Sequence, residues 1–434
     1  MSSTTITVRE YAKLTTASCT PSLDTHQVSV SAFAWLCKLQ GRLSKGGARL
    51  LEIEGQSWLR LNSLVGVVQT PCGTTLEVLP KTFSDASDVH SSRKLLCKMV
   101  AALLDLPGKE TSTAALERFN VPLTEWVMAQ FVEHLQQLLQ QGLRSDYVRL
   151  DEELPFLRGQ LNTLAQMRQP VTKAHLFHVR HDVFSPDQAA NRLLRLALER
   201  VRKATAQPVT WRLANELSHR LNEIPPSRLP EQDWRAWGTG RLMARYQAIK
   251  PWCELVLGES MPLALKGDSL GVSLLFPMEK LFESFVTRAL HKQMAKGYAL
   301  HAQQRQHFLA MHCGKRMFQL EPDLVVRDSQ GCAVAVLDTK WKRLEQSQSD
   351  GKSKYGIAPS DMYQMLAYGT TYMRGKGVMY LVYPRWQNFQ AALAEFTLPG
   401  ELQLHVVPFD LDQEELLLAQ PAGFVQSYTS KIAS

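Results

Sequence analysis

Two apolar runs, each with an aspartate at one end, lie in PDLVVRDSQGCAVAVLDTKWK, residues 322–342. The turn-forming residues DSQG (328–331) separate the runs, so the segment predicts a hairpin of two buried strands. The start of one antiparallel strand lies beside the end of its partner, and we therefore expect Asp323 and Asp338 at the same end of a sheet. Asp338 and Lys340 are two residues apart, which places their side chains on one face of the strand.

Two carboxylates beside a lysine suit phosphodiester hydrolysis. Asp323, Asp338 and the backbone carbonyl of Thr339 supply hard oxygen ligands of the kind that hold Mg²⁺. Such an ion polarises a phosphate and helps to generate hydroxide, while Lys340 can orient the attacking water or stabilise developing charge. The structural alternative makes Asp323 a turn cap and leaves Asp338 and Lys340 as an exposed pair. The abrupt end of the apolar run AVAVL in charged residues favours the nuclease interpretation.

Predicted helices flank this hairpin in the sequence. The first, Met278–Gly297, has helical spacing of its large apolar residues, and we expect these to be buried: Leu281, Phe282, Phe285, Leu290 and Met294. Glu283 stands within this apolar stretch. It is either a third carboxylate of the site, and so a further metal ligand, or an ordinary surface glutamate.

The second helix is predicted over Asp361–Met373, and the buried strand Gly377–Pro384 follows it. Gln364 and Tyr368 are four residues apart and share one helix face, where they could hold the lysine of the site or the DNA backbone. Alternatively, Asp361 and Gln364 form a capping box and Tyr368 belongs to the core. The two interpretations are compatible. From residue 265 to 434 the order of elements predicts an α/β domain.

The middle of the chain, residues 91–264, is predicted to be a helical domain. EWVMAQFVEHLQQLLQQG (125–142) and NRLLRLALERVRKA (191–204) both have helical spacing of apolar residues. The second helix also carries five cations, which could face DNA, although a solvated outer face is the favoured interpretation: Arg192, Arg195, Arg200, Arg202 and Lys203.

Residues 1–90 are predicted to form a small β-rich domain, either a barrel or a sandwich. ARLLEIEGQSWLRLNSLVGVVQT (48–70) alternates apolar and polar residues in places, and a second short strand, TTLEVLPKTF, follows the turn at Pro71-Cys72-Gly73. The whole chain is thus expected to be a multi-domain α/β protein.

The composition fits a globular protein with a polyanionic partner. The 434 residues are 45% hydrophobic and carry a formal net charge of +8, which favours a partner such as nucleic acid. Seven scattered cysteines include no CxxC pair, so neither a zinc site nor a disulfide framework is expected. No signal peptide or membrane-spanning run is predicted, which leads us to expect a cytoplasmic protein.

The motifs together resemble the McrC family of modification-dependent restriction systems. The resemblance rests on FPMEKLFESFV, EPDLVV, VLDTKWK and DMYQMLAYG, and upstream on LRGQLN, FSPDQAANRLLRLAL and LEVLPKTF. It covers roughly residues 70–390 and implies a restriction-endonuclease-like PD-(D/E)xK core at the C-terminal end. By the resemblance, Asp323, Asp338 and Lys340 are the nuclease triad, with Glu283 and Gln364 as auxiliaries. The second acid is Asp338 where the wider superfamily more commonly has Glu.

The resemblance also implies partners and a division of labour. McrC proteins work with a hexameric AAA+ GTPase, McrB, whose GTP hydrolysis they stimulate, and they cut modified DNA. This chain has no GxxxxGK[ST] phosphate loop, so it is not expected to be the motor. We therefore expect a Mg²⁺-dependent, type IV-like restriction endonuclease subunit whose residues 1–90 contact the motor. The alternatives are a RecB-like repair exonuclease and a non-cleaving adaptor that stimulates an AAA+ partner.

Overall fold

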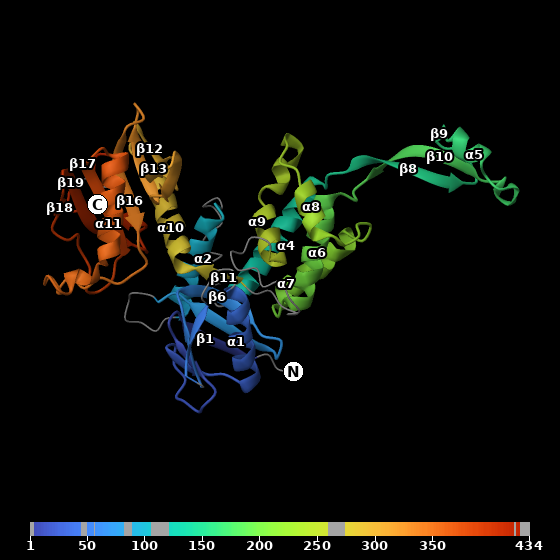
Figure 1. Ribbon diagram of the computed structural model, residues 1–434. Helices are drawn as coiled ribbons and strands as arrows, with labels where there is room; N and C mark the ends of the chain where they lie inside the picture. The colour runs from blue at the N-terminus through green and yellow to red at the C-terminus, as the bar shows by residue number, and fades with distance from the viewer. Residues whose placement is uncertain are drawn as a thin grey trace, which may run out of the picture. The chain divides into compact units, whose positions relative to one another are not determined.

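The computed structural model describes residues 4–44, 50–55, 57–81, 89–105, 121–258, 274–420 and 422–425. The chain folds into two compact units, of which the first combines Met1–Asn120 with Leu275–Ser434 and the second is Val121–Leu274. The first unit therefore contains both ends of the colour ramp, blue and red, in Figure 1. Within the described ranges, no helix is long and apolar enough to span a membrane.

The N-terminal part of the first unit holds two four-stranded sheets. One has the order β1-β7-β6-β11 and the other β3-β2-β5-β4. The strands are β1 (Thr4–Arg9), β2 (Lys13–Thr15), β3 (Thr25–Gln27), β4 (Leu51–Glu54), β5 (Trp58–Leu61), β6 (Leu64–Gln69), β7 (Thr74–Leu79) and β11 (Leu274–Pro277). The strand-rich character expected for residues 1–90 is thus confirmed, although Thr82 and Phe83 of the LEVLPKTF motif lie outside the described residues.

A helix that we did not predict also lies in this region. α1 (Val30–Ser44) begins after Ser29, whose Oγ accepts a hydrogen bond from the backbone N–H of Ala32 at 3.2 Å. Ala32, Leu36 and Leu39 are buried, at the spacing of one helix face. The N-cap serine and this periodicity are readable in the sequence, so the expectation of strands alone was incomplete.

The C-terminal part of the first unit is built around a seven-stranded sheet. Its order is β12-β15-β16-β17-β19-β18, with β20 paired to β19. The strands are β12 (Tyr298–Ala302), β15 (Leu324–Asp328), β16 (Ala333–Thr339), β17 (Lys376–Pro384), β18 (Phe396–Leu398), β19 (Glu401–Asp410) and β20 (Glu415–Leu416). A separate ribbon of β13 (His307–His312) and β14 (Lys315–Leu320) lies between β12 and β15 in the sequence.

The predicted order of helix, strand, turn, strand, helix and strand is confirmed. β15 and β16 are antiparallel, with Leu324 opposite Leu337, and β16 continues through the helix α11 (Pro359–Tyr372) into the parallel strand β17. α10 (Met278–Gln293) is the first predicted helix. The strands β12–β14 and β18–β20 are additions that the sequence patterns did not indicate.

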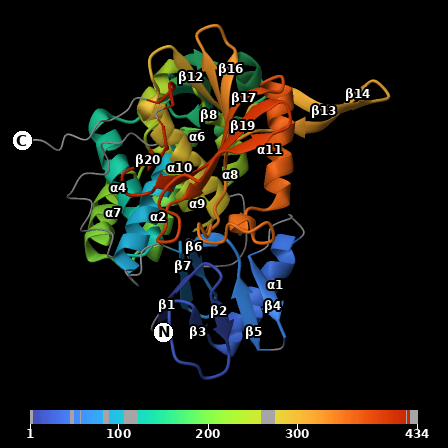
Figure 2. The same ribbon diagram turned by 90° about the vertical axis from the view of Figure 1, so that its left-hand side faces the viewer.

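α10 and α11 cover opposite faces of this sheet (Figure 2). Met365, Tyr368 and Tyr372 of α11 pack in one core with Val325 and Val336 of the hairpin. On the other face, Phe409 of β19 contacts the rings of Phe282 and Phe285 of α10. Alternate residues of the buried strands therefore serve two separate helix layers.

Gly369 allows α11 to lie close to the sheet. A β-carbon at this position would be 2.7 Å from the sulfur of Met379 and 2.8 Å from Cδ1 of Leu402. Real side chains do not approach so closely, so any larger residue would push the helix away from β17 and β19. The position of α11 matters because this helix carries Gln364 and Tyr368.

The two parts of the first unit are joined by specific contacts. Trp341, the residue after Lys340, donates from Nε1 to Oε1 of buried Glu10 at 2.9 Å. Met278, the first residue of α10, donates its backbone N–H to the carbonyl of Ser63 at 2.9 Å. The N-terminal sheets thus hold the beginning of α10 and the segment that follows β16.

The compact units divide the chain differently from the three segments drawn from the sequence. The boundary between residues 90 and 91 falls inside α2 (Val89–Leu103), which packs against α10 in the first unit and buries apolar residues that include Leu96 and Val100. The boundary between residues 264 and 265 lies outside the described residues. A helix with a buried apolar face belongs with the surface that covers it.

The second unit is mainly helical, as expected for the middle of the chain. Its helices are α4 (Leu123–Gln141), α5 (Thr163–Met167), η3 (Val171–Lys173), α6 (Ala189–Ala204), α7 (Pro208–Arg220), α8 (Pro230–Ala236), η4 (Arg241–Tyr246) and α9 (Lys250–Leu257). α4 and α6 coincide with the two amphipathic helices read from the sequence. Leu193, Leu194 and Val201 of α6 are fully buried.

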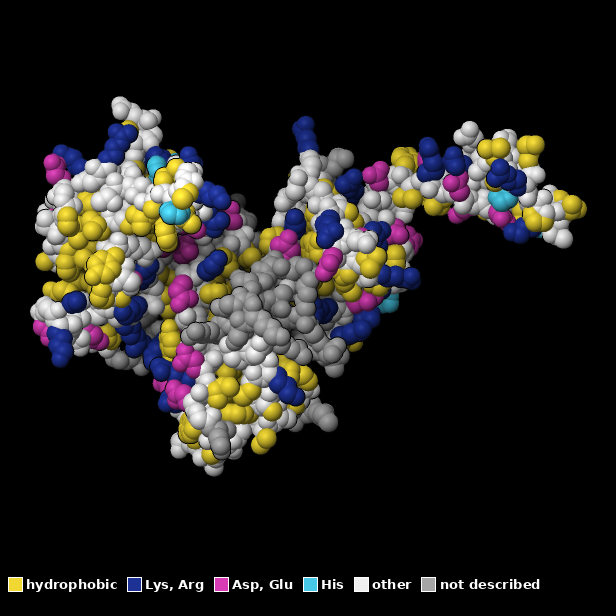
Figure 3. Space-filling model, viewed as in Figure 1, with side chains coloured by type: hydrophobic (Ala, Val, Ile, Leu, Met, Phe, Trp, Pro, Cys, Tyr) yellow, Lys and Arg dark blue, Asp and Glu magenta, His cyan; other side chains and the backbone are white. Residues whose placement is uncertain are grey.

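A long antiparallel arm extends from the helices of the second unit and was not predicted (Figure 1). It consists of β8 (Asp146–Leu154) and β10 (Phe177–Ser185), with β9 (Gln160–Leu161), α5 and η3 at its tip. Apolar side chains are interspersed with Lys and Arg on its visible surface (Figure 3). Those exposed at the tip by more than half of their surface are Phe156, Leu157, Leu164, Met167 and Val171.

Three of the arginines of α6 bond to other parts of the second unit. Arg192 pairs with Asp187 at 3.0 Å and with Asp233 at 2.6 Å. Arg195 donates to the carbonyl of Ser218, and Arg200 donates to two carbonyls at the end of α9. Arg195 and Arg200 thus hydrogen-bond the C-terminal ends of neighbouring helices, where backbone carbonyls lack helical partners.

The first prediction concerns Arg192, because Asp233 is only 6% exposed. Arg192→Ala leaves this carboxylate with Ser227 as its remaining hydrogen-bond donor, and we expect it to destabilise the second unit by about 3 kcal/mol. The measurement is native-state hydrogen exchange of the α6 amides in urea. The matched control is Arg149→Ala, whose ion pair with Asp182 is exposed and contributes at most about 1 kcal/mol. Equal effects of the two changes would show that the Arg192 pairs are not structural.

Candidate functional site

The hairpin brings Asp323 and Asp338 to one end of the seven-stranded sheet, as predicted. Asp323 immediately precedes β15 and Asp338 is the penultimate residue of β16. Oδ2 of Asp323 accepts two hydrogen bonds from Thr339, one from the backbone N–H and one from the hydroxyl, both at 2.7 Å. These bonds fix one carboxylate against the strand that carries the other.

Asp338 is almost completely buried, with 1% of its surface exposed. Burial raises the pKa of Asp338 to about 7, and the nearby charge of Asp323 adds to the effect. Its Oδ2 atom lies 2.6 Å from Nζ of Lys340 in an ion pair, but the contact lacks the angles of a hydrogen bond. An isolated carboxylate in this position would be costly, so the lysine and the aspartate depend on each other.

Lys340 is held by a chain of side chains from α11. Its Nζ donates to Oε1 of Gln364 at 3.1 Å, and Nε2 of Gln364 donates to the hydroxyl of Tyr368 at 2.7 Å. Tyr368 in turn donates to the backbone carbonyl of Glu321 at 2.9 Å. Burial would lower the pKa of Lys340, but the neighbouring aspartates Asp338, Asp323 and Asp361 together outweigh it, and the pKa is raised.

These hydrogen bonds can be compared with the two interpretations of Gln364 and Tyr368. Gln364 contacts Lys340, and Tyr368 is also part of the core, with 4% of its surface exposed. The capping box is not formed, because the residue at the N-cap of α11 is Ala358 and no side chain caps the helix there. Gln364 has both ends of its amide engaged within the site.

Glu283 lies at the edge of this arrangement. Its Oε1 accepts a hydrogen bond from Nε2 of Gln303 at 2.9 Å, and the backbone N–H of Gln303 donates to the carbonyl of Asp323 at 2.9 Å. Burial raises the pKa of Glu283, and the charge of Asp323 raises it further. Glu283 is therefore a half-buried carboxylate close to Asp323 and not a solvated surface residue.

Asp361 is a residue of the site that the sequence did not identify as one. It lies in the first turn of α11, and its Oδ2 accepts a hydrogen bond from the hydroxyl of Tyr383 at 3.3 Å. Its charge contributes to the raised pKa of Asp338. The packing of α11 on β16 and β17 brings Asp361 close to Asp338. In the sequence it read as a helix-capping residue.

The oxygen atoms of the site define what it can bind. Among the described residues, no group of three or more His, Cys, Asp or Glu side chains forms a ready metal cage. Asp323 and Asp338 nevertheless supply two carboxylates, of which the first is bonded to the backbone N–H of Thr339, and Oδ2 of Asp338 has no hydrogen-bond donor. Mg²⁺ in proteins is commonly held by one or two carboxylates, with water and phosphate oxygens completing the shell. This donor set fits such an ion.

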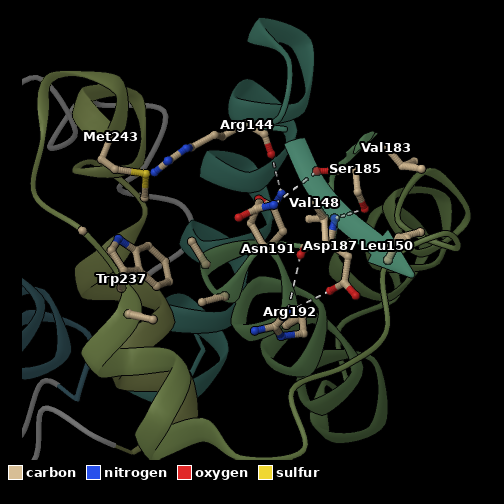
Figure 4. Close-up of a pocket in the computed structure, with 15 residues that line it drawn as sticks. Arg144, Val148, Leu150, Val183, Ser185, Asp187, Asn191, Arg192, Trp237 and Met243 are labelled. Carbon is tan, nitrogen blue, oxygen red and sulfur yellow. Dashed lines mark hydrogen bonds and ion pairs between the residues drawn. The ribbon is translucent and has the colours of Figure 1, made fainter. Parts of the chain in front are cut away.

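A cavity of about 660 Å³ in the second unit lies where the arm meets α6 (Figure 4). Its polar lining is engaged internally: Asn191 donates to the carbonyls of Arg144 and Pro186, and Arg192 pairs with Asp187. Trp237 and Met243 form an apolar wall. The cavity lacks clustered carboxylates or nucleophiles, and its residues fasten the base of the arm.

Comparisons with known proteins point to one family. A family model described as "McrBC 5-methylcytosine restriction system component" matches residues 59–384 of the chain. The match includes Glu283, Asp323, Asp338, Lys340 and Gln364. No curated protein matches the sequence.

Two solved structures share the fold. One is described as a refined half-complex from a tetradecameric assembly of Thermococcus gammatolerans McrB AAA+ hexamers with bound McrC. The alignment covers 95% of this chain and 98% of that one, with a TM-score of 0.69 and 20% identity. The other, a cryo-EM structure of the McrBC complex of the same organism, has a TM-score of 0.52 and 20% identity over 68% of this chain and 89% of that one.

The second prediction follows from the buried carboxylates. Since burial raises the pKa of Asp338 to about 7, the folded protein binds a proton that the unfolded chain releases near pH 4. In the metal-free protein, this contribution to stability is present below about pH 4 and is lost as the pH rises to 7. Asp323 and Glu283 act in the same direction.

The measurement is urea unfolding of the chelator-treated protein between pH 4.5 and 8. Asp338→Asn removes the titrating group, and we expect it to reduce the loss of unfolding free energy over this range by on the order of 2 kcal/mol. The control is Glu401→Gln, an exposed acid on β19. If wild type and Asp338→Asn have parallel pH profiles, Asp338 is ionised at all of these pH values in the folded state.

Proposed function

Because the chain belongs to the McrBC 5-methylcytosine restriction system component family, we propose that it is the DNA-cleaving subunit of such a system. The observation that carries the proposal is the buried Asp338, which stands between Asp323 and Lys340 at the end of a central strand. The order Pro322-Asp323, Asp338-Thr339-Lys340 on two antiparallel strands supports a PD-(D/E)xK core. The family membership and the absence of helicase motifs argue against a RecB-like exonuclease.

Each side chain of the site has a proposed task in phosphodiester hydrolysis. Asp323 and Asp338 hold the metal and are themselves held by Thr339 and Lys340. Lys340, with its ammonium group kept in place by Gln364, orients the attacking water and stabilises charge on the phosphate. Glu283, a half-buried carboxylate close to Asp323, is the auxiliary acid of the site.

Mg²⁺ is the proposed cofactor, with Asp323, Asp338, the Thr339 carbonyl and Glu283 as its ligands. When bound, the ion supplies polarisation of the scissile phosphate and lowers the pKa of water. The repulsion between the carboxylates supports a cation at this position, since a positive charge would oppose the rise in the pKa of Asp338 that the charge of Asp323 causes.

The proposed partners are modified DNA, with 5-methylcytosine as the first candidate, and a hexameric McrB-like AAA+ GTPase. The related assembly from Thermococcus gammatolerans, described as McrB hexamers with bound McrC, supports the second partner. The sequence has no phosphate loop of its own, so GTP hydrolysis is assigned to the hexamer. The remaining alternative is an adaptor that stimulates the hexamer and does not cut.

Two surfaces are candidates for the contact with the hexamer. Residues 1–90 were the choice from sequence, and they expose Val30 and Ile53 by 72% and 58%. The arm offers a larger set of exposed apolar side chains at its tip, including Met167 at 85% and Val171 at 91%. Exposed apolar residues on a projecting element are typical of a partner contact, which favours the arm.

The third prediction tests the chemistry. Asp323→Ala or Asp338→Ala should reduce Mg²⁺-dependent cleavage of modified plasmid DNA, in the presence of the cognate hexamer, by more than about 100-fold, because each removes a metal ligand. Lys340→Ala should lower the cleavage rate with little change in DNA affinity, because its task lies in the transition state. Circular dichroism checks that the variants are folded.

The control for these changes is Glu401→Ala, which removes an exposed carboxylate paired with Lys376 on the surface of the same sheet. It should cleave like wild type. Cleavage at the wild-type rate by either aspartate variant would show that the triad is misassigned. If Lys340→Ala weakens DNA binding by the same factor as cleavage, the lysine is only a phosphate contact.

The fourth prediction concerns the hexamer. The isolated protein should show little specific cleavage and no GTPase activity, and the cognate hexamer should switch on GTP-dependent cutting. Asp338→Ala should still accelerate GTP hydrolysis by the hexamer, because the change is confined to the proposed cleavage site. The measurement is GTP turnover with and without each protein.

The same assay locates the contact. Leu154 and Phe177 are paired across the arm, so residues 155–176 can be replaced by Asn-Gly, the preferred two-residue hairpin turn. We expect this trimmed arm to lose most of the stimulation, and Val30→Asp with Ile53→Asp to retain it. The reverse result would assign the contact to residues 1–90. Removal of residues 1–90 is not a clean test, because Glu10 and Ser63 hold the C-terminal part of the unit.

A further inference from the structure

The ribbon of β13 and β14 contacts α11 at its base and projects away from the seven-stranded sheet (Figure 2). Ten of its twelve strand residues are paired in a two-stranded ladder that runs from His307–Leu320 to His312–Lys315 and is interrupted at Leu309 and Phe318. Large apolar side chains are exposed along it: Leu309 at 56%, Met311 at 66%, Met317 at 43% and Phe318 at 71%. A two-stranded ribbon without a covering layer is only marginally stable in water, and exposed apolar residues of this kind are typical of a binding surface.

The base of the ribbon is fastened to the helix of the candidate site. The hydroxyl of Tyr372 donates to the carbonyl of Gln304, in the segment that leads into β13, at 2.7 Å, and to the carbonyl of Leu320, the last residue of β14, at 3.1 Å. The ring of Tyr372 also contacts the ring of His307 edge-on, with centroids 4.5 Å apart. One turn earlier on α11, Tyr368 holds the carbonyl of Glu321 and the amide of Gln364.

This anchoring places the ribbon next to the cleavage site along the chain. Asp323 follows Leu320, the last residue of β14, by three residues, a span of at most about 10 Å. A ligand held by the ribbon would therefore lie beside Asp323 and Asp338. The ribbon and the lysine of the site share one support, α11.

The positive charge of the ribbon favours a negatively charged ligand. Residues 307–320 contain Lys315, Arg316 and two histidines but no aspartate or glutamate. The guanidinium of Arg316 lies over the ring of Phe308 at 5.6 Å, so cationic and apolar groups occur together. Two copies of the ribbon facing each other across a two-fold axis would bring like charges together, which disfavours a self-contact.

Phe318 gives the ribbon a projecting aromatic side chain. Its φ of 58° lies in the left-handed region, which bulky residues rarely adopt. The ladder omits the pair that Phe318 would form with Leu309, although the pairs on both sides of it are present. Backbone outliers of this kind persist where a side chain is put to use.

From these features we propose that the β13–β14 ribbon enters a groove of the DNA duplex and seats it on the cleavage site. The major groove admits a two-stranded β-ribbon. Lys315 and Arg316 would contact phosphates, and Phe318 and its apolar neighbours would contact base edges or wedge between base steps. The inference rests on the proposed function in one respect, namely that duplex DNA is the substrate of the Asp338 site.

The experiment measures duplex binding without cleavage. The full chain with Asp338→Ala is titrated, in the presence of EDTA, against a fluorescent DNA duplex at several salt concentrations. The ribbon variants in this background are the pair Lys315→Ala with Arg316→Ala, and separately Phe318→Ala. Matched controls elsewhere in the same unit are Lys376→Ala, with its side chain 75% exposed, and Ile53→Ala, with its residue 58% exposed.

We expect the cation pair to reduce the slope of log affinity against log salt by about 1.8, because two phosphate contacts are lost. Phe318→Ala should weaken binding about fivefold or more at every salt concentration without changing the slope. The two controls should bind like the parent protein. Retention of both wild-type affinity and slope by the ribbon variants would overturn the proposal.

Two further outcomes also decide against it. The first is an unchanged affinity with a change in sedimentation, since the ribbon would then cover a second copy of the chain. The second is an absence of duplex binding by the parent protein. Neither outcome bears on the triad, because the cleavage assays of Asp323→Ala and Asp338→Ala decide the proposed function independently.

Discussion

Asp338 lies almost entirely out of water at the end of a buried strand, and a carboxylate in that position must be compensated by fixed neighbours. Lys340 provides the opposite charge, but only because Gln364 and Tyr368 keep its ammonium group in place. The helix that carries them approaches the sheet closely through Gly369. The packing of α11 on the sheet therefore affects the electrostatics of the site, because a shift of the helix would remove the hydrogen bond from Lys340 to Gln364.

The burial of these carboxylates also lowers the stability of the folded protein. Asp323, Asp338 and Glu283 have raised pKa values, because burial and mutual repulsion oppose their ionisation. A core of apolar side chains would be more stable at this position, and functional sites commonly retain such a disadvantage. A cation bound between the carboxylates would remove part of it, so the same groups that weaken the empty site would favour binding.

The sequence predicted those parts of the molecule in which burial imposes a pattern. The strands β15 and β16 are covered on both faces, so they read as apolar runs, and the charges at their ends stood out. The ribbon β13–β14 and the arm strand β8 are mostly exposed on both faces and have neither an apolar run nor strict alternation, and both the ribbon and the arm were missed. Asp361 was missed for another reason, since it joins the site only through the packing of α11, a contact that spacing along the chain does not encode. α1 could have been found from its cap and periodicity.

The first unit is discontinuous, because about 150 residues of the second unit separate its two segments. β11, the edge strand next to β6, follows that insertion, and its neighbour Met278 bonds to Ser63. During synthesis, the N-terminal sheets must therefore wait for the whole second unit to leave the ribosome before their last strand is available. If the insertion were a flexible loop, its length would add only slightly to the entropy cost of bringing its two ends together. A folded insertion whose ends lie close together would reduce that cost further. Early folding of the second unit would thus prepare the assembly of the first, and translation pauses within residues 121–274 would affect the yield of both.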